Sequence, residues 1–222
     1  MRGPIRWRKE SATTLLEVLV LVATMSAIAA ILYPLYAPKK GRGCGPRCDN
    51  NLKTVGLSLR FFSTDNGGQF PWEISTNQGG TAEIPQDAAN VWRQYAAISN
   101  ELSTPKIVVC PQDGERRMAN NFRTLANTNL SYFLGLLANE ENPETILAGD
   151  RNLTINRAPV APGLLQLGTN QHVGFSMKIH KNMGNILLGD GSVQQVTGPR
   201  FRQAVVAAAV ASTNAVNRLL IP

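Results

Sequence analysis

Cysteine and histidine, which supply many protein metal ligands and nucleophiles, are scarce: the 222 residues include three cysteines and two histidines. Cys44 and Cys48 enclose three residues rather than two, so they do not form a C-x-x-C redox pair. Because no second cysteine pair follows, the spacing also argues against a zinc site. We therefore expect no metal, no cofactor and no catalytic residue, with a hydrolase as a minor alternative.

Acidic residues are few and unevenly placed. Twenty-two lysines and arginines face 15 acids, which gives a formal net charge of +7, and no acid follows Asp190. Most of the acids lie in residues 61–150, so the chain is basic toward both ends and acidic in the middle. A DNA-binding domain would concentrate its bases on one face, and no helix-turn-helix, zinc-finger or RNP pattern accompanies them. We expect no specific nucleic-acid partner.

The longest apolar run lies near the N-terminus. After a basic segment at residues 1–10, the 22 residues Leu15–Tyr36 contain Glu17 as their only charge. A helix of this length reaches about 33 Å, against about 30 Å for a bilayer's hydrocarbon core. We predict a transmembrane helix over residues 13–36, since buried helices of soluble proteins are seldom apolar on every face. Basic residues on both flanks nearly balance, so charge does not set the orientation.

Glu17 is unusual inside this run. An acidic residue at the centre of a membrane helix costs on the order of 2.5–3.5 kcal/mol, and somewhat less near the helix end. Its position therefore suggests a function, although it could merely reach the headgroups. The segment could be an uncleaved anchor, or a signal peptide cut near residues 27–29, which would leave a hydrophobic stub.

The residues around Glu17 indicate a third fate. The sequence SATTLLEVLV, at residues 11–20, resembles the class III signal of type IV pilins and type II secretion pseudopilins. In that family a prepilin peptidase cuts before the apolar run, leaves glutamate as the fifth mature residue and methylates the new amine. The resemblance implies a basic leader at residues 1–12 and a cut between Ala12 and Thr13. The family prefers glycine and phenylalanine at these two positions, and this chain departs from both.

The same resemblance implies that Glu17 acts in assembly. A new amine at Thr13 would be a cation in or near the bilayer, four residues before Glu17 on the same helix. The two groups can therefore meet within one chain or between neighbouring subunits. Such a pair would set the stagger of one helix against the next.

The C-terminal part carries a second resemblance. His180, nine residues and then Asp190-Gly191 match the H-x9-DG motif of a subgroup of pseudopilin-like proteins that is abundant in Planctomycetes and Verrucomicrobia. Stretches at residues 51–56, 104–111 and 147–152 look like the same subgroup. Asp190-Gly191 between two apolar runs predicts a β-hairpin, with His180 bonded to the turn or packed on the sheet. In the alternative, His180 and Asp190 are a catalytic pair or metal ligands; a hydrolase would bring both together with Asp150.

The expected fold class is α+β and pilin-like. A Gly/Pro/basic linker at residues 37–47 follows the transmembrane helix and leads to an extracytoplasmic domain at residues 48–222. Leu52, Val55 and Leu59 recur at helical spacing and predict a helix packed on an antiparallel β-sheet. The domain is expected to end with the hairpin and a helix over residues 200–220.

A domain outside the inner membrane permits disulfides. Cys48 is expected to open the second helix and Cys110 to end a Val-rich strand, so a bond between them is attractive. It would close a loop of roughly sixty residues, worth up to about 4 kcal/mol in chain-entropy models. Cys44 could replace Cys48 or stay free, and three reduced, buried thiols are the alternative.

These features together lead us to expect a prepilin-like pseudopilin, a structural subunit of a type II secretion or type IV pilus-like filament. The resemblance implies a prepilin peptidase, sibling pseudopilins and an assembly platform as partners, with self-association. It also implies a single-pass inner-membrane protein whose C-terminal domain lies in the periplasm or at the cell surface. The alternative is an inner-membrane-anchored binding module that does not polymerise.

Overall fold

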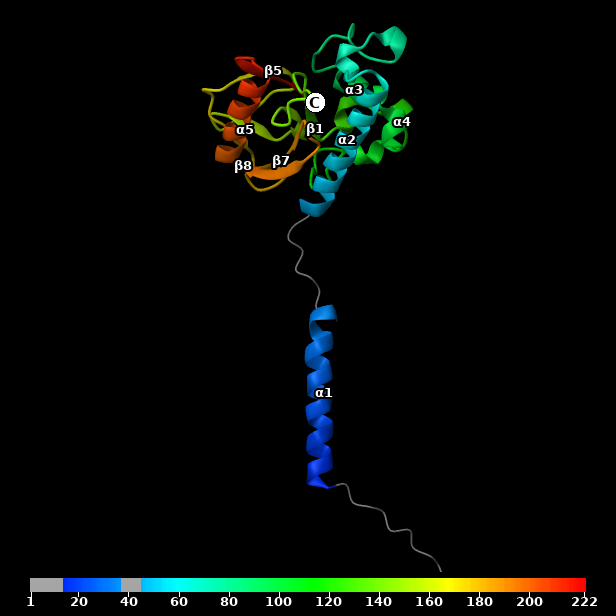
Figure 1. Cartoon of the computed structure of the whole chain (residues 1–222), viewed down its shortest axis with the longest axis vertical. Helices are drawn as coiled ribbons and strands as arrows, with labels where there is room; N and C mark the ends of the chain where they lie inside the picture. The colour runs from blue at the N-terminus through cyan, green and yellow to red at the C-terminus, as the bar shows by residue number, and fades with distance from the viewer. Residues whose placement is uncertain (1–13, 37–44) are drawn as a thin grey trace, which may run out of the picture. The chain divides into compact units, whose positions relative to one another are not determined.

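The computed structural model describes residues 14–36 and 45–222, with the backbone alone for residues 30–36, 45 and 46. The chain divides into two compact units, residues 1–42 and residues 43–222. Figure 1 shows helix α1 of the first unit and the helices and strands of the second.

Helix α1 (Leu15–Tyr36) forms the described part of the first unit. Its start is stabilised by a reciprocal pair of hydrogen bonds: the Glu17 amide donates to Thr14 Oγ1 at 3.4 Å, and the Thr14 amide donates to Glu17 Oε2 at 2.9 Å. This is a capping box, in which threonine is the N-cap and glutamate the third helical residue. None of the described helices is both long and apolar enough to cross a membrane.

The second unit begins with helix α2 (Gly45–Asp65). Leu52, Val55 and Leu59 are fully buried, and their spacing places them on one face, as the sequence predicts. That face packs against β7, where Gly56 allows a close approach to Leu187. The predicted arrangement of a helix on a sheet is confirmed.

The main sheet of this unit is six-stranded and antiparallel throughout, in the order β5-β9-β1-β2-β7-β8. Its strands are β1 (Tyr132–Gly135), β2 (Ile146–Asp150), β5 (Gly163–Gly168), β7 (Met183–Leu188), β8 (Val193–Thr197) and β9 (Val216–Ile221). A smaller sheet has the order β4-β3-β6, with β3 (Leu153–Ile155), β4 (Ala158–Pro159) and β6 (Val173–Phe175). The α+β class and the antiparallel sheet are confirmed.

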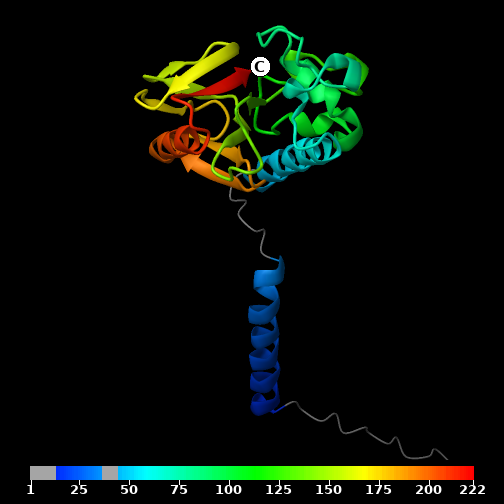
Figure 2. The same ribbon diagram turned by 45° about the horizontal axis from the view of Figure 1, so that its top comes forward.

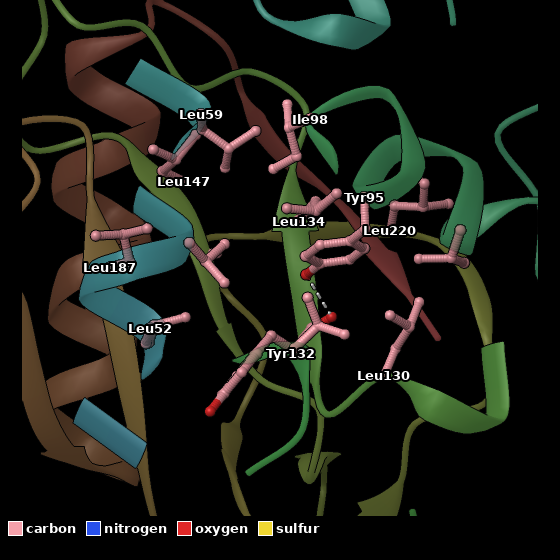
Figure 3. Close-up of a cluster of buried hydrophobic side chains, with 14 of the residues drawn as sticks. Leu52, Leu59, Tyr95, Ile98, Leu130, Tyr132, Leu134, Leu147, Leu187 and Leu220 are labelled. Atoms are coloured by element: carbon pink, nitrogen blue, oxygen red, sulfur yellow. Dashed lines mark hydrogen bonds between the residues drawn. The ribbon is translucent and has the colours of Figure 1, made fainter. Parts of the chain in front are cut away.

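Each face of the main sheet carries its own core, because successive side chains of a strand point to opposite faces. The first core lies between the sheet and α2; Figure 3 shows its buried side chains, among them Leu134, Leu187 and Leu220. The second core lies under helix α5 (Gly198–Ala211). It contains Phe133 and Ile186, which precede Leu134 and Leu187 in their strands and point to the opposite face. In Figures 1 and 2, α2 and α5 lie on opposite sides of the strands.

Short helical segments fill the connection between α2 and β1. They are η1 (Pro71–Glu73), η2 (Thr76–Gln78), α3 (Val91–Ala97), α4 (Ser99–Leu102), η3 (Pro105–Val108), η4 (Phe122–Thr124) and η5 (Asn127–Asn129). Tyr95 on α3 is fully buried, and its hydroxyl donates to the Tyr132 carbonyl at 2.9 Å. Figure 3 shows this contact within the first core.

The expected helix over residues 200–220 is wrong in its second half. Helix α5 ends at Ala211, Thr213 adopts a left-handed backbone with φ of 54°, and the chain returns as β9 between β5 and β1. β9 pairs with β5 over six residues, from Val216 to Ile221. The backbone hydrogen bonds of a central strand outweigh the heptad-like spacing that suggested a continuous helix.

Two other boundaries differ from expectation. The helix after the linker begins at Gly45, so residues 45–47 of the predicted linker are helical, as suits a proline near a helix start; residues 37–44 lie outside the described residues. The Val-rich segment before Cys110 is the 3-10 helix η3 and not a strand. Thr104 caps this helix by accepting from the Lys106 amide at 3.4 Å, and Pro105 occupies its first turn.

Candidate functional site

The candidate site is a buried group of polar side chains, here called the Cys–His–Asp cluster: Cys48, Cys110, Asp150, His180 and Asn185. All five are at most 5% exposed. The first turns of α2 and the loop after η3 carry the two cysteines, and β2 ends at the aspartate. The histidine precedes β7, and the asparagine lies within it. Four segments that are distant in sequence therefore meet at one place.

The structure joins Cys48 and Cys110 in a disulfide, with Cα atoms 5.1 Å apart and a sequence separation of 62. The bond ties the first turns of α2 to the loop after η3. Cys44 lies outside the described residues. Both bonded cysteines are fully buried, so the bond is shielded from solvent.

Asp150 is a fully buried carboxylate that faces Asn185 across the β2–β7 pair. Its Oδ2 accepts from the Asn185 amide at 2.6 Å and from Asn185 Nδ2 at 2.9 Å. Oδ1 has no hydrogen-bond partner among the described residues. Burial raises the pKa of Asp150 to about 7, although the two bonds from Asn185 favour the charged form.

His180 meets three groups through one ring nitrogen. Nε2 lies 3.1 Å from Asn185 Nδ2, 3.3 Å from Asp150 Oδ2 and 3.5 Å from Cys110 Sγ. Burial lowers the pKa of His180, which favours the neutral imidazole. Because an amide nitrogen can only donate, Nε2 of the neutral ring accepts from Asn185 Nδ2.

This geometry differs from that of a cysteine-histidine hydrolase. Such enzymes use one ring nitrogen of histidine for the nucleophile and the other for an orienting group. Here the same nitrogen faces Cys110, Asp150 and Asn185, and Cys110 is bonded to Cys48.

Asp190 and Gly191 are not part of the cluster. They form the tight turn of the β7–β8 hairpin, where Asp190 Oδ1 accepts from the Ser192 amide at 2.8 Å and Gly191 adopts φ of 84°. The six residues of β7 separate this turn from His180, which is ~20 Å for an extended strand. The predicted hairpin is confirmed, but His180 packs at the other end of β7 and is not paired with Asp190. Of the two aspartates that a hydrolase would bring to His180, Asp150 lies beside it and Asp190 does not.

A second polar group lies beside the cluster. Arg151 makes a two-pronged ion pair with the buried Asp113, at 2.7 Å from Nε and 2.8 Å from Nη2. Glu115 binds both Arg151, at 2.8 Å, and Lys178, at 2.6 Å. These hydrogen bonds lower the pKa of Glu115 to about 2. The group ties the loop after Cys110 to the end of β2 and the segment before His180.

Sequence reasoning assigned no role to Asn185, Asp113 or Arg151, and considered Asp150 only as part of a hydrolase. The sequence did point to Cys110, Asp150 and Arg151. Cys110 lies within residues 104–111, and the other two lie within residues 147–152; both stretches resemble the pseudopilin-like subgroup. Those stretches converge with His180 in the fold. Nothing in the sequence around Asn185 indicates its contact with Asp150.

At the N-terminus, Ala12 and Thr13 lie outside the described residues. Glu17 is described, and its carboxylate is turned toward the helix start through the 2.9 Å hydrogen bond from the Thr14 amide. The pattern T-x-x-E before an apolar run is the ordinary signature of this capping box, which was not among the features predicted from the sequence.

No family model matches the chain, and no match was found among curated proteins or among solved structures.

Proposed function

We propose that this protein is a membrane-anchored filament subunit. Within that class, we propose a prepilin-like pseudopilin of a type II secretion or type IV pilus-like system. The proposal takes the 22-residue apolar run of the sequence, Leu15–Tyr36, as a membrane span after removal of residues 1–12. It assigns the unit at residues 43–222 to the periplasm or cell surface, displayed on the filament.

The observation that carries the proposal is the placement of Glu17. It is the only charge of the apolar run, and its carboxylate lies at the start of α1, bonded to the amide of the residue after Thr13. Cleavage before Thr13 would create an amine one residue from that bond. A carboxylate in apolar surroundings is costly without a cation, so the new amine is its natural partner.

The side chains of α1 support association. Large apolar residues are exposed around the described part of the helix, for example Leu15 at 83%, Leu16 at 73% and Met25 at 69%. Apolar surface on all sides needs a bilayer or neighbouring helices to cover it. The partners proposed are a prepilin peptidase, sibling pseudopilins, an assembly platform and further copies of this chain.

The N-terminal peptide from native membranes tests processing. We expect the chain to start at Thr13, with or without a methyl group, in its intact mass and its N-terminal fragment spectra. A start near Ala30 would indicate a secreted domain, and an uncleaved chain would indicate an anchored binding module; either result contradicts the pseudopilin proposal.

Two substitutions separate the charge of Glu17 from its capping role. Glu17→Gln keeps an oxygen that can accept from the Thr14 amide but removes the charge, whereas Thr14→Ala removes the cap and leaves the charge. We expect Glu17→Gln to abolish cross-linking of the subunit into assemblies and Thr14→Ala to retain most of it. Normal assembly of Glu17→Gln would mean that Glu17 is only a helix cap. Thr24→Ala, on the same helix, is the matched control.

A further inference from the structure

Three residues of the Cys–His–Asp cluster carry atoms that commonly bind metal ions. The Sγ atoms of Cys48 and Cys110 and the Nε2 of His180 all lie within 4.8 Å of one another, and all three residues are buried. In a tetrahedral zinc site, bonds of about 2.3 Å to sulfur and about 2.0–2.1 Å to nitrogen place the ligand atoms roughly 3.3–3.8 Å apart. Small side-chain movements would therefore bring these three atoms around one ion.

The positions of the neighbouring groups also suit a cation. His180 Nε2 lies 3.5 Å from Cys110 Sγ, and an imidazole nitrogen is a common ligand of zinc. Asp150 lies beside it, fully buried, with Oδ1 unpartnered among the described residues. Two sulfur atoms, a ring nitrogen and a carboxylate thus lie close together in a buried place, a set of donor groups that a bound cation would stabilise.

We propose that Cys48, Cys110 and His180 form a redox-controlled site for a thiophilic divalent cation such as Zn²⁺, with the carboxylate of Asp150 next to the ligand His180. The oxidised chain closes the site with the S–S bond, and the reduced chain opens it. Two thiolates and an imidazole are a ligand set that zinc prefers. The proposal does not depend on filament assembly.

The chemistry balances with a phosphine as the reductant. The phosphine breaks the Cys48–Cys110 bond, gives up two electrons, takes oxygen from water to become its oxide, and leaves two thiols. A divalent cation then replaces the two thiol protons, which pass to solvent. A small-molecule disulfide reverses the process by accepting the two electrons, so that the S–S bond forms again and the cation is released.

The test uses the full chain in detergent micelles, with Co²⁺ as a spectroscopic probe and Cys44→Ser as the reference, because that change removes the third thiol. After phosphine reduction we expect about one equivalent of Co²⁺ with thiolate-to-cobalt charge transfer and tetrahedral visible bands. Zn²⁺ should displace it. The oxidised reference should bind none.

Three further variants identify the ligands. On the Cys44→Ser background, Cys110→Ser should lose the charge-transfer band of a two-thiolate site, His180→Gln should weaken Co²⁺ binding at least about tenfold, and Asp150→Asn should weaken it about 10–100-fold. Circular dichroism of oxidised His180→Gln checks that the fold is kept. The proposal is overturned if the reduced reference binds no Co²⁺, unfolds whether or not Co²⁺ is present, or binds as tightly without His180.

Discussion

The two faces of the six-stranded sheet are stabilised in different ways. Under α5 the core is apolar and aromatic, with Phe175 and Phe201 in contact at a centroid distance of 5.0 Å. Under α2 the core is also apolar, but its edge carries a disulfide and a buried carboxylate beside a histidine. The α5 face therefore depends mainly on packing, with a buried hydrogen bond from Asn217 Nδ2 to the Val205 carbonyl, whereas the α2 face also depends on covalent and ionisable groups that can respond to redox state and pH.

The largest loss of stability is expected on the α5 face. Phe201→Ala removes a fully buried ring that contacts Phe133 and Phe175 and leaves a cavity, so the free energy of unfolding should fall by about 3–5 kcal/mol. Denaturant unfolding followed by near-ultraviolet circular dichroism measures it. Val206→Ala, on the exposed side of α5, is the matched control and should change stability by less than about 0.5 kcal/mol. Equal losses in both variants would contradict the assignment of the core face.

Breaking the disulfide should weaken the α2 face nearly as much. The double change Cys48→Ser with Cys110→Ser should lower the free energy of unfolding by about 2–5 kcal/mol, because it frees a long loop in the unfolded chain and places hydroxyls in a buried site. Added reductant should destabilise the natural chain but not the double variant. A natural chain indifferent to reductant in metal-free buffer would show that the bond contributes nothing.

The close approach of α2 to β7 gives a smaller effect. A Cβ at Gly56 would lie 2.8 Å from Leu187 Cδ1, in a fully buried part of the core. Crowding of this kind costs about 1–3 kcal/mol, and the better helix propensity of alanine offsets up to about 1 kcal/mol. Gly56→Ala should therefore destabilise by roughly 1–2 kcal/mol in the same unfolding assay. Stabilisation instead would mean that α2 can move away from the sheet without loss.

A further comparison concerns pH and sharpens the contrast between the faces. The pKa of Asp150 is raised from 3.8 to about 7 in the folded chain, so folding favours the protonated acid. The stability from this group is fully present below about pH 4 and is lost as the pH rises toward 7. The stability difference between natural and Asp150→Asn chains should thus shift in favour of the natural chain as pH falls from 7 to 5. Phe201→Ala should show no such change relative to the natural chain.

Local patterns predicted much of the fold. The spacing of Leu52, Val55 and Leu59 predicted the buried face of α2, and Asp190-Gly191 predicted the hairpin, because both patterns depend on residues close in sequence. The C-terminal strand was missed, since its pairing with β5 and β1 is a contact between distant segments. The Val-rich segment before Cys110 was mistaken for a strand because a capping threonine and a proline turned it into a 3-10 helix instead.

The sequence by itself determined the apolar segment with its single charge, the amphipathic face of α2 and the hairpin turn, because each is encoded by neighbouring residues and their backbone preferences. Only the tertiary structure decided that Cys110, Asp150 and His180 meet. Their meeting requires the pairing of β2 with β7 and the packing of η3 against α2, which are contacts between segments far apart in the chain. The pKa values of Asp150 and His180 were decided at the same level, because burial, and not sequence position, sets the cost of their charged forms.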